Sequence, residues 1–184
     1  ALELLGRAFS NDGSSLQRLS LNRNIISSAG LRALRLEHAS KLTYFHAFGN
    51  DIHFARIGGR TTTSRLENVN LRNNNIRIDE EFCEGLRHCT TLRTLFLSSN
   101  DVGDDGAEFL ADCLRQRDSS SSASLTSLYL SCNRIGDRGA CALASMLHEN
   151  TSLHLLDLYD NDIRDAGALA FAGALKRINF TMRE

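Results

Sequence analysis

The sequence contains no proline and no apolar run that approaches the roughly 20 residues of a membrane-spanning helix. Without proline, helices can run without an imposed break. The net charge is only −1 and the two signs are interspersed, so no strong field draws the chain to nucleic acid or an anionic membrane. The first ten residues also lack the basic start and long apolar core of a secretory signal. We therefore expect neither nucleic acid nor a membrane as a partner.

Cysteine is present, but its arrangement argues against a disulfide framework. Small secreted domains that depend on disulfides usually carry an even number of cysteines. Here the number is odd and no two cysteines form a CxxC pair: Cys83, Cys89, Cys113, Cys132 and Cys141. The sequence therefore predicts reduced, mostly buried thiols in a cytoplasmic protein.

No group of residues has the spacing that enzymatic chemistry requires. The sequence shows no paired carboxylates, no nucleophile beside a base and no phosphate-binding loop. Its six histidines have no pairing that suggests zinc. The densest acidic clusters, 101–105 and 157–165, lie where a turn leads into a helix, which favours helix capping over a metal site. We predict no catalytic residue, no metal site and no cofactor, and hence no enzyme.

One pattern recurs along the chain. Residues 125–135 read LxxLxLxxNxI, and Gly139, Leu143 and Leu147 follow at helical spacing. The same pattern returns 28 residues later, from Leu153. A short strand, an asparagine turn and an amphipathic helix that repeat at such a period are typical of a solenoid. The repeats start near residues 16, 42, 66, 92, 125 and 153.

Two repeats depart from the regular pattern. After Ile52, the second repeat continues with Gly58-Gly59 and three threonines, so we expect irregular or short 3₁₀ structure in place of a helix. The fourth repeat is longer because the serine-rich segment 117–124 precedes the next strand. That segment is either a plain linker or, beside Arg115 and Arg117, a regulated phosphorylation site.

Both ends of the sequence suggest further repeats. Residues 1–15 have the helical spacing of a repeat whose strand is missing, and the segment after Leu175 suggests a seventh strand. We therefore expect a single domain over residues 1–184 that is a piece of a longer protein. Its uncapped ends would allow self-association.

The repeated pattern resembles the leucine-rich repeat, in the ribonuclease-inhibitor-like form found in NOD-like receptors and Ran GTPase-activating proteins. The resemblance implies an α/β fold: a curved, horseshoe-shaped solenoid segment of about six repeats, with a parallel β-sheet on its concave face and helices on its convex face. Nearly all such proteins act by binding another protein. The Ran activators are the catalytic exception, but their loop residues have no match here and their acidic tail is missing.

An asparagine occupies the same place in every repeat. In a tight turn, an amide side chain can both donate to and accept from backbone groups. Stacked from repeat to repeat, these side chains are predicted to form a structural ladder: Asn24, Asn50, Asn74, Asn100, Asn133 and Asn161.

The strand positions between the leucines predict a binding surface. Side chains alternate along a strand, so positions 3, 5 and 7 of each repeat face away from the core, onto the concave side. All three tyrosines fall there. Aromatic side chains that gather on a surface are typical of protein–protein interfaces, although scattered surface aromatics are also normal. The predicted partner-binding residues are Tyr44, His46, Phe48, Arg72, Phe96, Tyr129, Asp157 and Tyr159.

The sequence therefore predicts a non-catalytic protein–protein interaction scaffold that binds a partner protein on its concave face. The alternative is a GTPase-activating protein of the Ran-activator type, or a fragment of one. A third possibility is an architectural segment that associates through its ends. The partner's identity stays open, as does the question whether the irregular second repeat is a specialised site.

Overall fold

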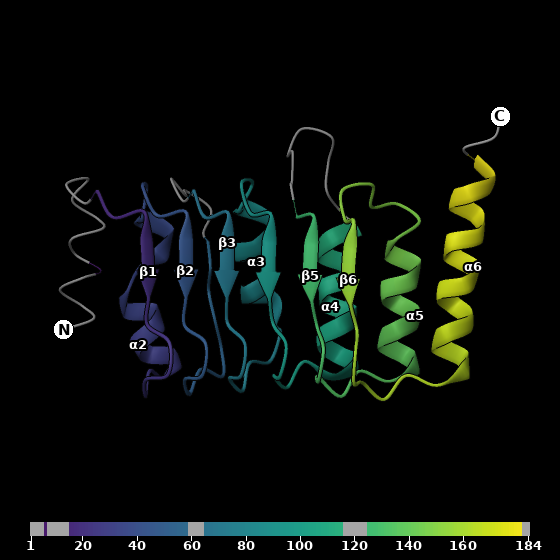
Figure 1. Cartoon of the computed structure of the whole chain (residues 1–184), viewed down its shortest axis with the longest axis horizontal. Helices are drawn as coiled ribbons and strands as arrows, with labels where there is room; N and C mark the ends of the chain where they lie inside the picture. Colours follow the sequence, from purple (N-terminus) through teal and green to yellow (C-terminus); the bar gives the residue numbers. More distant parts are fainter. Residues whose placement is uncertain (1–5, 7–14, 59–64, 116–124, 182–184) are drawn as a thin grey trace.

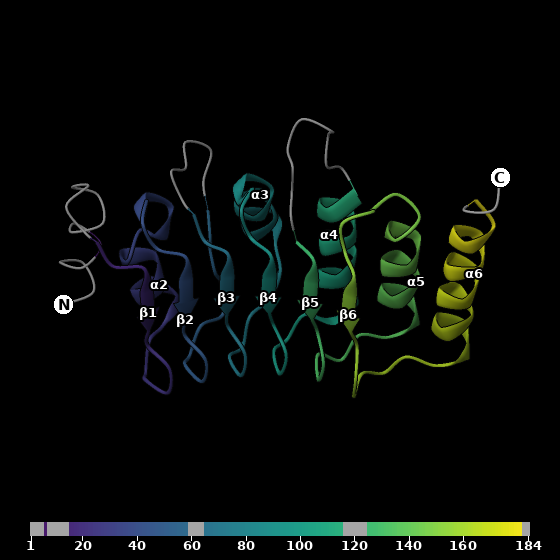
Figure 2. The same cartoon turned by 45° about the horizontal axis from the view of Figure 1, so that its top comes forward.

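The computed structural model describes residues 6, 15–58, 65–115 and 125–181. The serine-rich segment at 117–124 and nearly all of residues 1–15 lie outside these ranges. Within them, six parallel strands form one open sheet, and the helices lie on one side of it (Figure 1). Turning the molecule by 45° shows the strands and helices as two layers that advance together along the chain (Figure 2). This architecture confirms the predicted α/β solenoid.

The strands are short and stand in strict chain order. Neighbouring strands pair at equivalent positions of successive repeats, so that Leu95, for example, pairs with Val69 on one side and Leu128 on the other. A three-residue strand has only one side chain on the core side, and this register brings those side chains into one row. The strands are β1 (Arg18–Ser20), β2 (Tyr44–His46), β3 (Asn68–Asn70), β4 (Thr94–Phe96), β5 (Ser127–Tyr129) and β6 (Leu155–Asp157).

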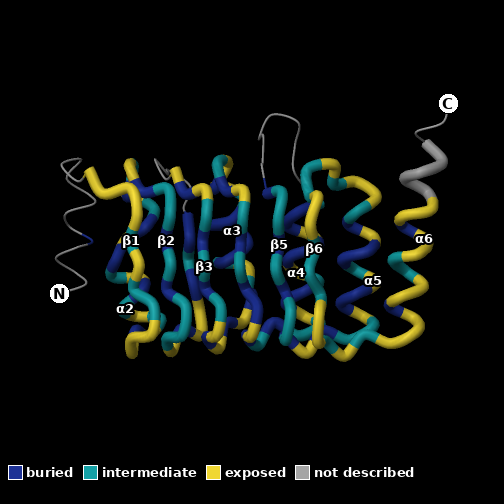
Figure 3. The backbone as a smooth tube through the Cα atoms, in the orientation of Figure 1, coloured by how far each residue is buried: buried dark blue, intermediate teal, exposed yellow. Residues whose placement is uncertain are grey.

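The core lies between the sheet and the helices. Phe45, Val69, Leu95 and Leu128, from the middle of β2 to β5, are fully buried. Each such leucine stabilises the fold by about 1.5–3 kcal/mol relative to an exposed one. Burial is greatest in the middle of the solenoid, and β6 and the last helix at the C-terminal end are largely exposed or intermediate (Figure 3).

Helices follow five of the six strands in the described part of the chain. Successive helices from the third repeat onward pack against one another. Phe82 and Leu86 of the third repeat are fully buried in the core. The helical elements are α2 (Ser28–Ala33) with the 3₁₀ helix η1 (Leu36–His38), α3 (Glu80–His88), α4 (Gly103–Arg115), α5 (Asp137–Met146) and α6 (Asp165–Thr181).

The second repeat replaces its helix with an extended segment. Residues 53–58 contain no helix, as expected, and Ile57 and Gly58 are buried. A Cβ atom at position 58 would lie 2.5 Å from the carbonyl oxygen of Gly85, so only glycine permits this approach to α3. The irregular repeat is therefore packed onto its neighbour.

The prediction of a seventh strand after Leu175 is wrong. Helix α6 continues through residues 176–181, where the sequence suggested that a new strand begins. No glycine or proline interrupts the chain between Gly173 and Thr181, and lysine and arginine at 176–177 favour a helix. The apolar residues of this segment therefore continue a helix.

The asparagine that occupies the same place in each repeat forms hydrogen bonds with backbone groups. Asn100 Nδ2 donates to the carbonyl oxygens of Leu97 in its own repeat (2.8 Å) and Leu71 in the preceding repeat (3.0 Å). Its Oδ1 accepts the N–H of Ile76 (2.9 Å). Asn100 thus joins two repeats, and the same bonds recur at Asn50, Asn74, Asn133 and Asn161, whereas Asn24 donates only within its own repeat among the described residues.

The residue before each asparagine has a left-handed backbone. The φ angle lies between 50° and 66° at all six of these positions, a region that L-residues enter seldom. This conformation turns the chain out of the strand and into the bend that contains the asparagine. The residues are Arg23, Gly49, Asn73, Ser99, Cys132 and Asp160.

Candidate functional site

The sheet has one face without helices, which we call the open sheet face. It carries the side chains at positions 3, 5 and 7 of each repeat, and its central column follows the strand register. That column brings Phe96 and Tyr129 onto adjacent strands, with Asn70 between His46 and Phe96. In chain order it reads Ser20, His46, Asn70, Phe96, Tyr129 and Asp157.

Three of the predicted site residues form a compact group, the central cluster: Arg72, Phe96 and Tyr129. The two rings stack with their centroids 4.5 Å apart and their planes at 18°. The guanidinium carbon of Arg72 lies 4.7 Å from the centroid of Phe96 and 5.4 Å from that of Tyr129. Both distances are within the range of cation–π attraction. The rings thus hold the positive charge of Arg72 at the middle of the open sheet face.

Two polar atoms at this cluster have no hydrogen-bond partner among the residues that the structure describes. Arg72 Nε is buried without an acceptor, and Ser98 Oγ is likewise buried, with the residue only 5% exposed. The two residues occupy position 7 of adjacent repeats, where the N–H of Asn73 donates to the carbonyl oxygen of Ser98. Among the described residues, no carboxylate forms an ion pair with Arg72.

The N-terminal part of the open sheet face repeats the pairing of an arginine with a ring. The guanidinium of Arg18 lies 4.1 Å from the centroid of Tyr44, and that of Arg23 lies 5.6 Å from that of Phe48. Between them, His46 Nε2 is 3.0 Å from Asn68 Oδ1. Each predicted site residue of the second repeat is therefore in contact with a residue from a neighbouring strand or from the turn after one.

The last two predicted site residues lie at the C-terminal edge. Asp157 Oδ1 accepts the N–H of Tyr159 (3.0 Å), and Tyr159 is 77% exposed. Asp157 is the strand neighbour of Tyr129, but in the described structure neither edge residue makes a ring contact or an ion pair with the central cluster. The structure thus separates a central group from this edge.

The sequence predicts that five aromatic side chains stand exposed on the concave side, and the structure leaves only Tyr159 of these five exposed. Tyr44, Phe48, Phe96 and Tyr129 are half-buried because each packs on an arginine or on another ring. Sequence reasoning assigned no role to Arg18, Arg23 or Ser98. For Arg18 a signal was available in the sequence. Arg18 and Tyr44 both occupy position 3 of adjacent repeats, which places them side by side on neighbouring strands.

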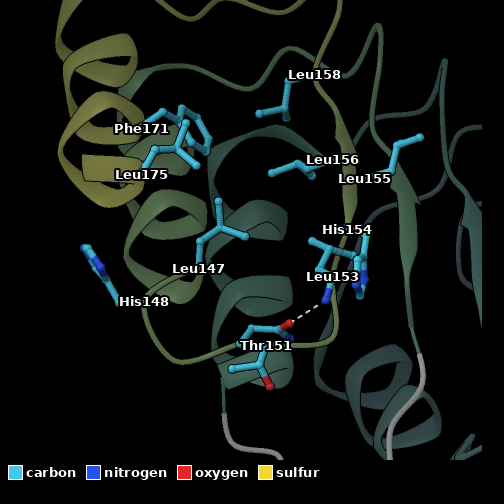
Figure 4. A pocket seen from close by; sticks show the side chains of 11 residues that line it. Leu147, His148, Thr151, Leu153, His154, Leu155, Leu156, Leu158, Phe171 and Leu175 are labelled. Atoms are coloured by element: carbon cyan, nitrogen blue, oxygen red, sulfur yellow. Dashed lines mark hydrogen bonds between the residues drawn. The ribbon is translucent and has the colours of Figure 1, made fainter. Parts of the chain in front are cut away.

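A hollow lies between β6 and α6. Its volume is about 720 Å³, and it is lined mainly by apolar side chains. Leu156 and Leu158 of the last strand segment point toward Phe171 and Leu175 of α6, whereas Leu155 points the other way (Figure 4). The side chains that would form the core of this repeat are only partly buried.

All five cysteines are free, and their surroundings differ. Cys83, Cys89 and Cys113 are buried, Cys132 is half-buried and Cys141 is exposed. A side-chain hydrogen bond with Cys113, together with burial, raises the pKa of the Cys83 thiol above its ordinary value. A hydrogen bond to the carboxylate of Asp160 raises the pKa of Cys132. Because the thiolate is the reactive form, neither thiol is activated as a nucleophile.

Within the described ranges, no group of histidine, cysteine, aspartate and glutamate side chains is arranged to hold a metal ion. No helix of the described chain combines the length and apolarity needed to cross a membrane. The acidic residues near position 101 make other contacts: Asp101 pairs with Arg77 at 3.1 Å and with Arg134 at 3.0 Å.

Comparison with known proteins identifies the repeat. Three segments, residues 88–111, 121–144 and 149–172, match a family model described as Leucine Rich repeat. The chain therefore contains leucine-rich repeats, and its fold is that of a leucine-rich-repeat solenoid. Among curated proteins, none matches this chain.

Solved structures share the architecture at low sequence identity. The tropomodulin C-terminal domain of Caenorhabditis elegans is similar over 99% of this chain and 95% of its own, with a TM-score of 0.58 and 19% identity. An internalin from Listeria monocytogenes matches 85% of this chain and 46% of its own (TM-score 0.47, 23% identity). The actin-binding site 2 of leiomodin-1 matches 98% and 90% (TM-score 0.42, 13% identity). At these identities the first likeness shows the fold alone.

Proposed function

We propose that this leucine-rich-repeat chain is a non-catalytic scaffold that binds another protein on its open sheet face. The observation that carries the proposal is the central cluster, in which Arg72 lies over the stacked rings of Phe96 and Tyr129. Arginine and aromatic side chains dominate the binding energy of protein interfaces when they are preorganised and partly desolvated. In this cluster the three side chains already pack on one another and are half-buried without a partner protein.

The surroundings of the cluster support the same function. Half-buried rings and arginines continue from the cluster toward β1, so the surface offers apolar area together with fixed hydrogen-bonding groups. Rigid anchors of this kind lose little conformational entropy on binding. We further infer that the repeats are of the ribonuclease-inhibitor-like type and that the protein acts in the cytoplasm, in keeping with the helices that follow most strands and with its five free thiols.

The test is affinity capture from a cell lysate with three forms of the chain. One is unaltered, one carries Phe96→Ala and Tyr129→Ala, and the control carries Phe109→Ala. Phe109 is 40% exposed on α4, in the helix layer, so the control removes an aromatic ring outside the open sheet face. Thermal unfolding must first show that all three forms are folded.

We expect proteins that bind the unaltered chain and the control and are lost from the double variant. Binding that persists in the double variant, or that is lost equally in the control, would contradict a site on the open sheet face. A small-GTPase hydrolysis assay with the unaltered chain tests the alternative of a GTPase activator, for which we expect no stimulation.

Self-association is a second candidate function, and the hollow between β6 and α6 favours it. β1 and β6 are the two edges of one parallel sheet, so the β6 edge of one copy could pair with the β1 edge of a second copy in a head-to-tail contact. Such a contact would also cover the apolar hollow. Light scattering over a concentration series tests this: a mass that rises with concentration supports it, and a constant monomer mass excludes it.

A further inference from the structure

The open sheet face has a one-sided charge distribution. Across β1 to β5, its fifteen positions carry two arginines and a histidine but no carboxylate. The only acidic side chain at an equivalent position is Asp157, on the edge strand β6. The fifteen residues are Arg18, Ser20, Asn22, Tyr44, His46, Phe48, Asn68, Asn70, Arg72, Thr94, Phe96, Ser98, Ser127, Tyr129 and Ser131.

The central cluster holds a positive charge without a counter-charge. The rings of Phe96 and Tyr129 fix the guanidinium of Arg72, and its Nε is buried without an acceptor in the described part of the chain. This donor is closed to solvent and lacks a partner, which costs free energy that a ligand recovers when the guanidinium turns toward it. The hydroxyl of Ser98, on the adjacent strand segment, is a second buried group of this kind.

The chemistry of these groups favours a carboxylate. A guanidinium presents parallel N–H donors whose spacing matches the two oxygens of a carboxylate, and such pairs are bidentate. Sites that recognise phosphate groups in proteins usually combine several arginines. The central cluster has only Arg72, and the rings beside it suit the aliphatic stem of an acidic side chain.

We propose that the central cluster binds a carboxylate group, so that the segment recognised on the open sheet face is an acidic stretch of another protein. The proposal rests on the proposed function, because it names the chemistry of the partner on that same face. Arg72 provides the ion pair, Ser98 a further hydrogen bond, and the basic residues toward β1 attract the rest of the acidic segment.

The experiment selects a phage-displayed library of random dodecapeptides on four forms of the chain. These are the unaltered chain, Arg72→Gln, the double variant Phe96→Ala/Tyr129→Ala, and the control Arg32→Gln. Arg32 is exposed on α2 and pairs with Glu81, so this control removes the same charge from the helix layer. Peptides selected on the unaltered chain are then synthesised with each acidic residue replaced by its amide.

We expect aspartate and glutamate to be enriched with the unaltered chain and the control, but not with Arg72→Gln. Replacing the contacting acidic residue in a selected peptide should weaken binding about tenfold, as the loss of a charged hydrogen bond predicts. Arg72→Lys keeps the charge but lacks the parallel donors, so it should restore only part of the affinity. On the unaltered chain, the Nε–Hε resonance of Arg72 should shift when the acidic peptide binds and stay in place with its amide form.

The outcomes separate this inference from the proposed function. Peptides that require Phe96 and Tyr129, but are not acidic and tolerate Arg72→Gln, would overturn the carboxylate site and leave a protein-binding face. Phosphoserine peptides that bind at least as well as glutamate peptides through Arg72 would likewise overturn it. Both proposals would be overturned if the selected peptides bound Arg72→Gln and the double variant as well as they bind the unaltered chain. A selection that enriches no peptide would also overturn both.

Discussion

Asp104 lies at the beginning of α4 but caps the helix of the following repeat: its Oδ1 accepts the N–H of Gly136 at 2.7 Å. The same oxygen accepts the N–H of Gly139 at 2.9 Å. Asp137 in turn bonds the N–H groups of Arg164 and Gly167, before and within α6. A carboxylate at a helix N-terminus satisfies free N–H groups and opposes the positive end of the helix dipole. Each aspartate thus couples two neighbouring helices.

Asp104→Ala should therefore lower the free energy of unfolding by about 1–2 kcal/mol, the upper part of the range for capping residues. Asp104→Asn keeps an acceptor oxygen and should lose less. Asp112→Ala is the matched control, because among the described residues the ion pair of this exposed side chain is with Arg115 three positions on, and such pairs contribute little. Urea unfolding curves give the three values; a loss for Asp104→Ala no larger than that of the control would contradict the role of the cap.

Asn100→Ala should cost about 1–3 kcal/mol, because the substitution removes a buried side chain that bonds backbone groups of two repeats. Asn24→Ala provides the comparison. Asn24 is exposed and donates to Leu21 and Asn22 of its own repeat. If both variants unfold within about 0.5 kcal/mol of the unaltered chain, the asparagines do not stabilise the solenoid as a ladder.

Gly139→Ala should destabilise the chain by about 1–3 kcal/mol through overpacking. A Cβ atom there would lie 2.8 Å from the Cβ of Ala107 and 2.9 Å from a methyl carbon of Ile135. Gly173→Ala is the contrasting change in α6, where no atom of the described part of the chain lies within 4 Å of the added Cβ, and it should stabilise by up to about 1 kcal/mol through helix propensity. Thermal unfolding of both variants measures the difference, and equal effects of the same sign would show that α4 and α5 are not in close contact.

The thiols should react with Ellman's reagent in a fixed order. Cys141 is exposed and should react first, and Cys132 should follow slowly at pH 8, since its raised pKa leaves less thiolate. Raising the pH should therefore accelerate Cys132. The buried Cys83, Cys89 and Cys113 should react only in denaturant. Cys141→Ser removes the first phase if the assignment is right; a fast phase that survives this change would contradict it.

The sequence predicted the strands and the core well, because side chains alternate along a strand and each leucine in the core therefore determines which face its neighbours occupy. A leucine that must enter the core at position 95 forces its neighbour Phe96 onto the other face, and the structure shows Leu95 fully buried. The repeating pattern then sets the register of every strand. These predictions depend only on which residues are apolar and how far apart they lie.

The pattern could not predict the contacts that depend on the rotamers of long side chains. The period places Arg72 and Phe96 on one face, but the stacking of the guanidinium on two rings follows from rotamers and neighbouring strands. The bonds of Asp104 reach a residue 32 positions away, beyond any local capping signal. Helix α6 continues where the sequence suggested a strand because the spacing of two apolar residues, Ile178 and Phe180, does not distinguish a strand from a helix.

The left-handed residue before each asparagine limits which amino acids this bend accepts. The six are arginine, glycine, asparagine, serine, cysteine and aspartate, and none is β-branched. A valine or isoleucine there would clash with its own backbone at positive φ and would push the asparagine behind it out of line. Variation at these six positions among natural sequences would thus be filtered by chain geometry, and a shared residue there would be no sign of a shared partner.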